Sequence, residues 1–514
     1  MSDPSPVFGF QNPDDHARLR DAFVRADFSL AGVPAALGVR SMEEFKGLGD
    51  PVIERRSRGG RPIDTMVRLF LIHSSVTIAS AERAFSPLSL ASLEAAGLLR
   101  VVGDHVEPAV EILPLNGYWY AFDMPARKTG RVREDYVMGV GTSSTLVARH
   151  AVRRPGATIL DMGCGAGYLA FELSPDAGRI VGVDRNPRAI QMARFNAALS
   201  NNSQCDFRIG DMFEPVKGER FDVIVTNPPF VISPEKTFIF RDSGRSGDSI
   251  VQEVCGAFGT HLNPGGWSSM VCNWAHLKGI PWQDRVASWF AGHDVDVMVI
   301  SSETRDADLY AWTWVHHTSG DEVAGMPARF EKWADSYEAA GIEAVSAGII
   351  VCRKRGDSQG PRVWFEDAPP SAATDASNVL SRHLERIFAN RAAIATLDAS
   401  SLATDGPRDW LASRPRLADG VVLDHRLTPS IDDGGNSGGW TSQRTELALT
   451  AGLGYRFTLD SSVLPIVTLM NGQRTLAAVL KDSEAAIGQP AARMVPSAVH
   501  ILKLLLQRGL VELL

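Results

Sequence analysis

The sequence contains few cysteines, and their spacing argues against two kinds of site. Five cysteines are scattered over 514 residues, and no two of them form a Cys-x-x-Cys pair. Disulfide frameworks and zinc sites need closer, patterned spacing. We therefore expect reduced thiols. The histidines show no metal-ligand spacing either, so we expect no metal site.

Long apolar runs and a positive net charge are also absent. No apolar run reaches the roughly 18 residues that a membrane-spanning helix needs, and the first residues show no basic stretch followed by an apolar one. These absences favour a cytoplasmic protein without a membrane partner. The net charge is −8, so the chain as a whole is not attracted to nucleic acid, although local basic clusters could still bind it.

The chain is long enough for about two to four domains. Residues 1–112 are predicted to be mostly helical and to end in two β-rich runs around Gly103-Asp104, a hairpin signal. Helices followed by a hairpin are typical of a winged-helix module that recognises nucleic acid or protein; a helical cap that only packs on the next domain is the alternative. Residues 357–377 are predicted to be a linker, and residues 378–514 a C-terminal domain with a winged-helix-like end.

Residues 113–356 alternate strand-like and helix-like runs. Examples of such strand–helix pairs are "ATILDMGCG" with "YLAFELSP", "RIVGVD" with "PRAIQMARFNAAL", and "FDVIVTNPPF" with "DSIVQEVCGAFGTHL". This rhythm predicts an α/β fold, with a Rossmann-like, mainly parallel sheet that is covered by helices on both faces.

A glycine-rich turn follows the first of these strands. Gly163, Gly165 and Gly167 let the backbone approach a ligand without obstruction by Cβ atoms. The spacing is G-x-G-x-G, whereas dinucleotide dehydrogenases use G-x-G-x-x-G. Asp161 precedes the first glycine by two positions, and a carboxylate there suits an ammonium or sulfonium better than a pyrophosphate. A purely structural acid is the alternative for Asp161.

The next strand ends at Asp184, 23 residues after Asp161. A carboxylate at about this offset accepts hydrogen bonds from both ribose hydroxyls of a bound nucleoside. We expect Arg185 at the same site. An N-cap role is the alternative for Asp184.

A third acid, Asp211, follows the strand-like run "CDFRI" and is placed where an adenine would lie. Asp211 would accept the adenine amino N–H, Met212 would offer its backbone N–H, and Phe213 would pack against the ring. An ordinary strand-to-loop turn is the alternative.

The run "FDVIVTNPPF" is an apolar strand interrupted by two prolines. Proline cannot donate to a sheet ladder, so Asn227-Pro228-Pro229-Phe230 ends the strand at its carboxyl end, where open α/β sheets bind ligands. In this order and spacing, the motifs resemble class I S-adenosylmethionine-dependent methyltransferases, in particular the amino-methylating branch marked by [Asn/Asp/Ser]-Pro-Pro-[Phe/Tyr]. That branch includes release-factor glutamine, ribosomal RNA guanine-N2 and adenine-N6 DNA methyltransferases. The resemblance covers roughly residues 116–355, and it implies a seven-stranded sheet and S-adenosylmethionine as cofactor.

The chemistry of such a reaction explains the motif. An amide or exocyclic nitrogen is a poor nucleophile because its lone pair is delocalised. The Asn227 side-chain oxygen and the Pro228 carbonyl would accept its two N–H groups and would hold the nitrogen for in-line attack on the methyl group. Pro229 helps to make the turn rigid, and Phe230 offers a flat apolar face to a planar group.

A hydroxyl-rich run, Thr142 to Thr145, lies upstream of the sheet and precedes a helix. In similar enzymes this segment lines the methionine end of the cofactor and the substrate mouth, so we expect Thr142 to contact the cofactor. An N-cap role is the alternative.

Three readings of the function compete. Residues 240–254, "FRDSGRSGDSIVQEV", resemble the loop that follows the motif in release-factor glutamine methyltransferases, which favours a glutamine side chain of a protein. The exocyclic amine of an RNA or DNA base is the first alternative, because two basic clusters could grip phosphates; they comprise Arg55, Arg56, Arg58, Arg61, Arg127, Lys128, Arg131 and Arg133. A non-catalytic S-adenosylmethionine-binding scaffold is the second alternative.

Overall fold

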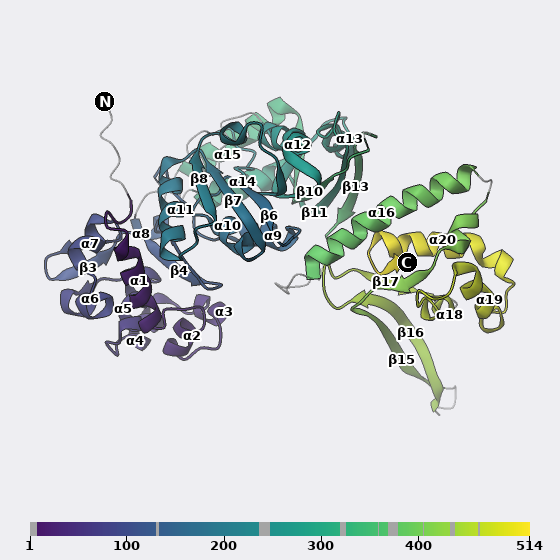
Figure 1. Cartoon of the computed structure of the whole chain (residues 1–514), viewed down its shortest axis with the longest axis horizontal. Helices are drawn as coiled ribbons and strands as arrows, with labels where there is room; N and C mark the ends of the chain where they lie inside the picture. Colours follow the sequence, from purple (N-terminus) through teal and green to yellow (C-terminus); the bar gives the residue numbers. More distant parts are fainter. Residues whose placement is uncertain are drawn as a thin grey trace. The chain divides into compact units, whose positions relative to one another are not determined.

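The computed structural model describes residues 8–129, 133–235, 247–318, 325–357, 359–368, 379–403, 406–431, 437–460 and 463–514. The chain divides into two compact units, Met1–Glu366 and Asp367–Leu514 (Figure 1). Within the described residues, no helix combines the length and the apolar character that crossing a bilayer requires.

Unit 1 is built around an eight-stranded mixed sheet. In sheet order the strands are β13 (Arg362–Asp367), β11 (Val295–Asp306), β12 (Ile342–Lys354), β10 (Leu262–Leu277), β9 (Phe221–Thr226), β6 (Ala157–Met162), β7 (Ala177–Asp184) and β8 (Cys205–Ile209). The α/β prediction is confirmed, but the count of seven strands is wrong. The additional edge strand, β13, lies inside the predicted linker, of which residues 358 and 369–377 lie outside the described residues.

The sheet is parallel from β8 to β10, while β12 runs antiparallel to both β10 and β11. The carboxyl ends of β6, β7, β8 and β9 therefore meet at one edge. The helices of this region are α8 (Ala126–Thr129), α9 (Thr142–His150), α10 (Tyr168–Leu173), α11 (Pro187–Leu199), α12 (Ser249–His261), α13 (Trp282–Ser288), α14 (Ala307–Thr318) and α15 (Met326–Ala340).

Strand β9 shows why the site forms at this edge. Phe221 and the run Val223 to Thr226 are buried, as in a strand with both faces covered. Pro228 and Pro229 lack the N–H groups that would continue the ladder, so pairing stops at Thr226. The next four residues are thus free to form a turn at the carboxyl edge.

The N-terminal part of unit 1, as far as the structure describes it, contains seven helices and five short strands. They are α1 (Asp14–Arg25), α2 (Gly32–Leu37), α3 (Met42–Lys46), α4 (Asp50–Arg56), α5 (Pro62–Phe70), β1 (Val76–Thr77), α6 (Ile78–Phe85), α7 (Leu90–Ala95), β2 (Leu99–Val102), β3 (His105–Pro108), β4 (Glu111–Leu115) and β5 (Tyr118–Phe122). Strands β1, β3 and β2 form an antiparallel sheet in that order, and β4 pairs with β5. The predicted boundary after residue 112 falls inside β4.

The β4–β5 hairpin joins this part to the large sheet. Trp119 Nε1 donates to the Phe28 carbonyl at 2.8 Å. On the other side, buried Asn196 of α11 donates to the carbonyls of Ala121 and Ala166, both at 3.0 Å. These bonds satisfy buried backbone groups across the junction, so the N-terminal part and the sheet form one packed unit.

Unit 2 combines helices with two small sheets. Its elements are α16 (Val379–Ala403), α17 (Arg408–Ala412), β14 (Pro415–Leu417), β15 (Val421–Ile431), β16 (Ser437–Leu449), β17 (Arg456–Leu459), α18 (Leu464–Thr468), α19 (Leu476–Ile487), α20 (Ala491–Gln507) and β18 (Val511–Leu513). Strand β14 pairs with β18, and β15, β16 and β17 form an antiparallel sheet in that order. In Figure 1 the β15–β16 ribbon extends away from the helices of this unit.

Candidate active site

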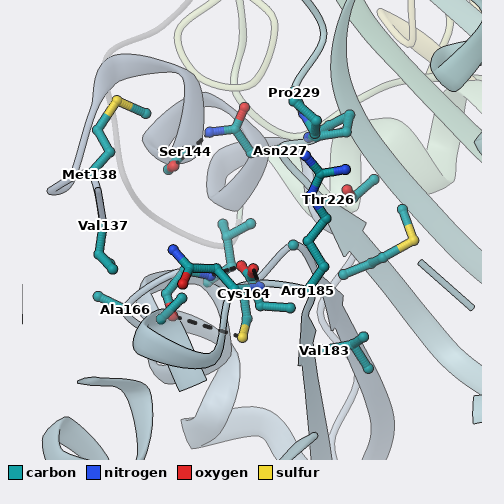
Figure 2. A pocket seen from close by; sticks show the side chains of 18 of the residues that line it. Val137, Met138, Ser144, Cys164, Ala166, Val183, Arg185, Thr226, Asn227 and Pro229 are labelled. Atoms are coloured by element: carbon teal, nitrogen blue, oxygen red, sulfur yellow. Dashed lines mark hydrogen bonds between the residues drawn. The ribbon is translucent and has the colours of Figure 1, made fainter. Parts of the chain in front are cut away.

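A cavity opens at the carboxyl edge of β6, β7, β8 and β9 (Figure 2). We call it the first cavity. Nine of the predicted site residues line it: Gly163, Gly165, Asp184, Arg185, Asp211, Met212, Asn227, Pro228 and Pro229. Four others, Asp161, Gly167, Thr142 and Phe230, do not line it. Residues that sequence reasoning did not single out complete the wall, among them Phe122, Tyr136 and Met138, and Ser144 of the predicted hydroxyl run also lines it.

The glycine turn has the backbone conformation that its sequence requires. Gly163, Gly165 and Gly167 have φ angles of 71°, 51° and 89°, a region that side chains disfavour. A Cβ atom on Gly165 would meet no atom within 4 Å, so this residue faces open space rather than a packed neighbour. Gly163 donates its N–H to the Val183 carbonyl at 2.8 Å, which holds the turn against β7.

Asp161 is fully buried behind this turn. One carboxylate oxygen accepts the Ala170 N–H at 2.9 Å and so ties the start of α10 to β6. The other oxygen has no hydrogen-bond partner within the described residues. Burial raises the pKa of Asp161 to about 7, and the nearby Asp184 adds to the rise. The structure therefore places Asp161 beneath the cavity rather than on its wall.

Asp184 lies on the cavity wall at the end of β7. Its two oxygens accept the N–H groups of Gly165 at 2.9 Å and Asn186 at 2.8 Å. Burial raises its pKa, and these two hydrogen bonds partly offset the rise. An ionised carboxylate has about four acceptor positions, so two remain for a ligand. The N-cap of α11 is Asn186 and not Asp184, because the Asn186 side chain accepts the Arg188 N–H at 3.0 Å.

The loop after β8 forms a further wall. Gly210 donates its N–H to the Asp184 carbonyl at 3.1 Å, and Asp211 and Met212, which follow it, line the cavity together with Asp184. Met212 has a φ of 47°, an uncommon value for a residue with a side chain. Phe213 does not reach the cavity. It is buried and stacks on His261 at 4.4 Å, so our expectation that it packs against a bound ring is wrong.

Asn227 is held by two serines of α9. Its side-chain nitrogen donates to Ser143 Oγ at 3.1 Å and to Ser144 Oγ at 2.9 Å, and Figure 2 shows the amide nitrogen directed at Ser144. The sequence-based prediction names Thr142 from the same hydroxyl run. The run marks the right turn of helix, but a sequence does not tell which of four adjacent hydroxyls faces the motif.

A second cavity lies on the other side of the motif. It is lined by Phe230, by Thr142, Ser143, Thr145, Leu146 and Arg149 of α9, by Val271 and Asn273 of β10, by Ser302, Glu303 and Arg305 of β11, by Tyr310, Thr313, Trp314 and His317 of α14, and by Val345, Ala347 and Gly348 of β12. Thr142 thus contacts this second cavity. The Asn227–Phe230 turn therefore stands between two cavities, with Asn227 on one side and Phe230 on the other.

The residues after the motif are fixed by two tyrosines that sequence reasoning did not find. Tyr310 of α14 accepts the Ile232 N–H at 3.2 Å and an N–H of Asn273 at 2.7 Å through its hydroxyl. Tyr337 of α15 donates its hydroxyl proton to the Ile232 carbonyl. Val231 and Ile232 are buried among the side chains of these helices. Residues 236–246, which include the start of the predicted acid- and glycine-rich loop, lie outside the described residues.

The first cavity fits S-adenosylmethionine on two grounds. Asp184 keeps acceptor positions for ribose hydroxyls, and the glycine turn leaves open space beside it. Two carboxylates and one guanidinium, those of Asp184, Asp211 and Arg185, give the wall a negative balance that suits a sulfonium and an ammonium. Within the described residues no group of His, Cys, Asp and Glu side chains could hold a metal ion.

Comparison with known proteins agrees with this geometry. Residues 138–279 match the family described as methyltransferase small domain, and residues 25–109 match a domain of unknown function, DUF7059. The release factor glutamine methyltransferase of Geobacter sulfurreducens is 32% identical over 174 residues, 28% of this chain and 61% of the relative. The corresponding enzyme of Koribacter versatilis is 33% identical over 126 residues, 22% of this chain and 45% of the relative.

A third relative is named for a ribosomal RNA and not for a release factor. The ribosomal RNA small subunit methyltransferase C of Alcanivorax borkumensis is 31% identical over 156 residues, 30% of this chain and 42% of the relative. The chain thus spans less than two thirds of the length of each of these relatives. Over residues 138–279 the chain is thus similar to a methyltransferase small domain, and the relatives that match it are named as methyltransferases.

Proposed function

We propose that the protein transfers a methyl group from S-adenosylmethionine to a planar nitrogen held at Asn227-Pro228-Pro229-Phe230. The observation that carries this proposal is the position of the turn between the two cavities. Cofactor in the first cavity and acceptor in the second would meet across the turn. Thr226 and Asn227 lie at the end of β9, beside Met162 at the end of β6, so the transfer point sits at the centre of the carboxyl edge.

The motif supplies hydrogen-bond acceptors to the nitrogen. Asn227 Oδ1 accepts no hydrogen bond from the described part of the chain, because the amide nitrogen is the atom that faces the serines. This oxygen and the Pro228 carbonyl can accept the two N–H groups of an amide or exocyclic amine. As the nitrogen attacks, positive charge develops on it, and both oxygens stabilise that charge. The cofactor, when bound, would supply the methyl group, its sulfur would leave as a neutral thioether, and the methylated nitrogen would release one proton to solvent.

We propose a glutamine side chain of a protein as the acceptor. Two of the relatives are named release factor glutamine methyltransferases. The basic clusters that would serve nucleic acid are partly engaged within the chain. Arg61 is bonded to Asp64 at 2.7 Å, Lys128 to Asp50 at 2.7 Å, and Arg133 to Asp135 at 2.7 Å. Such internal pairs reduce the positive charge that phosphates could meet. Arg131 lies outside the described residues.

We also propose that the part from α5 to β3 is a winged-helix module. The element order α5, β1, α6, α7, β2, β3 and the sheet order β1-β3-β2 support this assignment. Helix α7, which occupies the position of a recognition helix, contains neither Lys nor Arg, so protein is its better-matched partner. In unit 2, α19 and α20 directly precede β18, which pairs with β14, and this arrangement supports a similar module.

An exocyclic amine of a nucleic-acid base is the second candidate. The second cavity favours it, because Phe230, Tyr310 and Trp314 line it together with Arg149 and Arg305. Aromatic faces stack on bases, and guanidinium groups bind phosphates.

Transfer of tritiated methyl groups into fractionated lysate distinguishes these readings. The lysate comes from a strain that lacks this protein, so that acceptor sites are unmethylated. If protease removes the label and nuclease does not, the acceptor is a protein. If nuclease removes the label and protease does not, the acceptor is a nucleic-acid base. If the protein binds S-adenosylmethionine by calorimetry but labels neither fraction, the proposed catalysis is wrong and the scaffold reading gains support.

A further inference from the structure

We infer that Ser143 and Ser144 are positioning residues that hold the Asn227 amide at the start of α9, where its oxygen can face the acceptor nitrogen. This inference rests on the proposed function. The primary amide of asparagine presents two N–H donors about 120° apart in one plane. Ser143 Oγ at 3.1 Å and Ser144 Oγ at 2.9 Å accept one each.

Helix geometry explains how two adjacent residues can reach one nitrogen. Successive side chains of an α-helix are turned by about 100°, so neighbours rarely share a target on the helix face. Asn227 instead lies across the start of α9, which begins at Thr142 with Gly141 as N-cap. From there the second and third residues of the helix flank the amide, Ser143 on the side of the second cavity and Ser144 on the side of the first.

The orientation decides whether the motif can work. The two ends of an asparagine amide have nearly the same shape, so packing alone does not select between them. With the nitrogen toward the serines, the oxygen is presented to the acceptor. In the reversed state, the Asn227 NH₂ would face an acceptor NH₂, and two donors would oppose each other. A serine hydroxyl can accept from the amide nitrogen or donate to the amide oxygen, so the acceptor selects the productive state and the two hydroxyls hold the amide in place for it.

The first test is spectroscopic and needs no acceptor. In protein labelled with ¹⁵N-asparagine, the side-chain NH₂ signals of Asn227 are identified by their loss in Asn227→Ala. We expect these signals to shift and their hydrogen exchange to accelerate in a double variant, Ser143→Ala with Ser144→Ala. Ser144→Thr, which retains a hydroxyl, should keep the wild-type signals. Unchanged signals in the double variant would overturn the inference, whether or not the protein proves to be a methyltransferase.

The second test is kinetic, with tritiated S-adenosylmethionine and the lysate acceptor. Each lost hydrogen bond should lower kcat up to about tenfold, and the double variant more. The KM for S-adenosylmethionine and its calorimetric affinity should change less than about threefold. Ser144→Thr should restore transfer. A double variant that loses cofactor affinity instead of kcat would assign the serines to cofactor binding and overturn the positioning role.

Ser92 offers a matched control. It is the third residue of α7, as Ser144 is of α9. Among the residues that the structure describes, its hydroxyl bonds to the side chain of Ser89, and it lies far along the chain from the site. Ser92→Ala should leave the Asn227 signals and the transfer rate unchanged. If Ser92→Ala lowers kcat as much as the double variant, the effect is one of general stability and the inference fails.

Discussion

The buried carboxyl of Asp161 gives a pH-dependent prediction. In an unfolded chain an aspartate has a pKa of about 3.9, whereas burial raises the pKa of Asp161 to about 7 in the folded protein. As pH rises from about 4 to about 7, the unfolded chain releases this proton and the folded chain retains it. The free energy of unfolding therefore falls over this window, and it stops falling above the folded pKa.

Asp161→Asn removes this penalty. The amide oxygen of Asn can still accept the Ala170 N–H, and the side chain carries no charge to desolvate. A difference of about three pKa units corresponds to roughly 4 kcal/mol over the whole window. Between about pH 5 and pH 8, the variant should gain about 2–3 kcal/mol of stability relative to the wild type, most of it below about pH 7.

Urea unfolding of the full-length protein measures this difference, because contributions from unit 2 cancel between the two proteins. Asp222 provides a control of opposite sign on the same sheet. Although burial acts to raise its pKa, hydrogen bonds from Thr158 and Asn263 outweigh that effect and lower it. Asp222→Asn should therefore lose stability at neutral pH. A difference in unfolding free energy between wild type and Asp161→Asn that stays constant from about pH 5 to pH 8 would show that the pKa of Asp161 is not raised in the folded protein.

Two further predictions concern the walls of the site. Asp184→Ala should weaken S-adenosylmethionine by at least about 100-fold in calorimetry, because it removes the ribose acceptors and the partner of the Gly165 N–H; normal affinity would show that the ribose lies elsewhere. Tyr310→Phe leaves Ile232 N–H and Asn273 without their acceptor and should cost about 1–3 kcal/mol in urea unfolding. Tyr118→Phe should cost less, because its partner Ser174 keeps a hydrogen bond to Phe171, and equal losses would contradict the role of Tyr310.

The parts of the site that the backbone fixes are the parts that could be predicted from the sequence. Glycines at a strand end, an acid at the end of the next strand and a proline pair after a third strand each have a local physical cause. Parallel strands then bring their carboxyl ends together. These local rules alone place Asp184, Asp211 and Asn227 at one edge of the sheet, and all three line the first cavity.

Other features depend on contacts between distant residues, and local patterns do not reveal them. Asp161 has the spacing of a ligand contact, yet its side chain is buried behind the glycine turn, where it accepts the Ala170 N–H. Phe213 lies next to the cavity in sequence but stacks on His261, 48 positions later. The eighth strand is hidden because residues 362–367 lie in a stretch whose composition is typical of a linker. Tyr310 and Tyr337 bond to the backbone of Ile232, which lies close to them only in the folded chain.

Asn227→Ala decides whether the methyl group passes at the Asn227-Pro228-Pro229-Phe230 turn. Calorimetric affinity for S-adenosylmethionine and tritiated-methyl transfer are measured on the same preparation. Asn263→Ala serves as control, because Asn263 lies at the amino end of β10, away from the carboxyl ends of the strands that form the site. We expect Asn227→Ala to bind S-adenosylmethionine within about threefold of the wild type and to lose transfer by at least about 100-fold, while Asn263→Ala retains both. Transfer that persists in Asn227→Ala would contradict the claim that the methyl group passes at this turn.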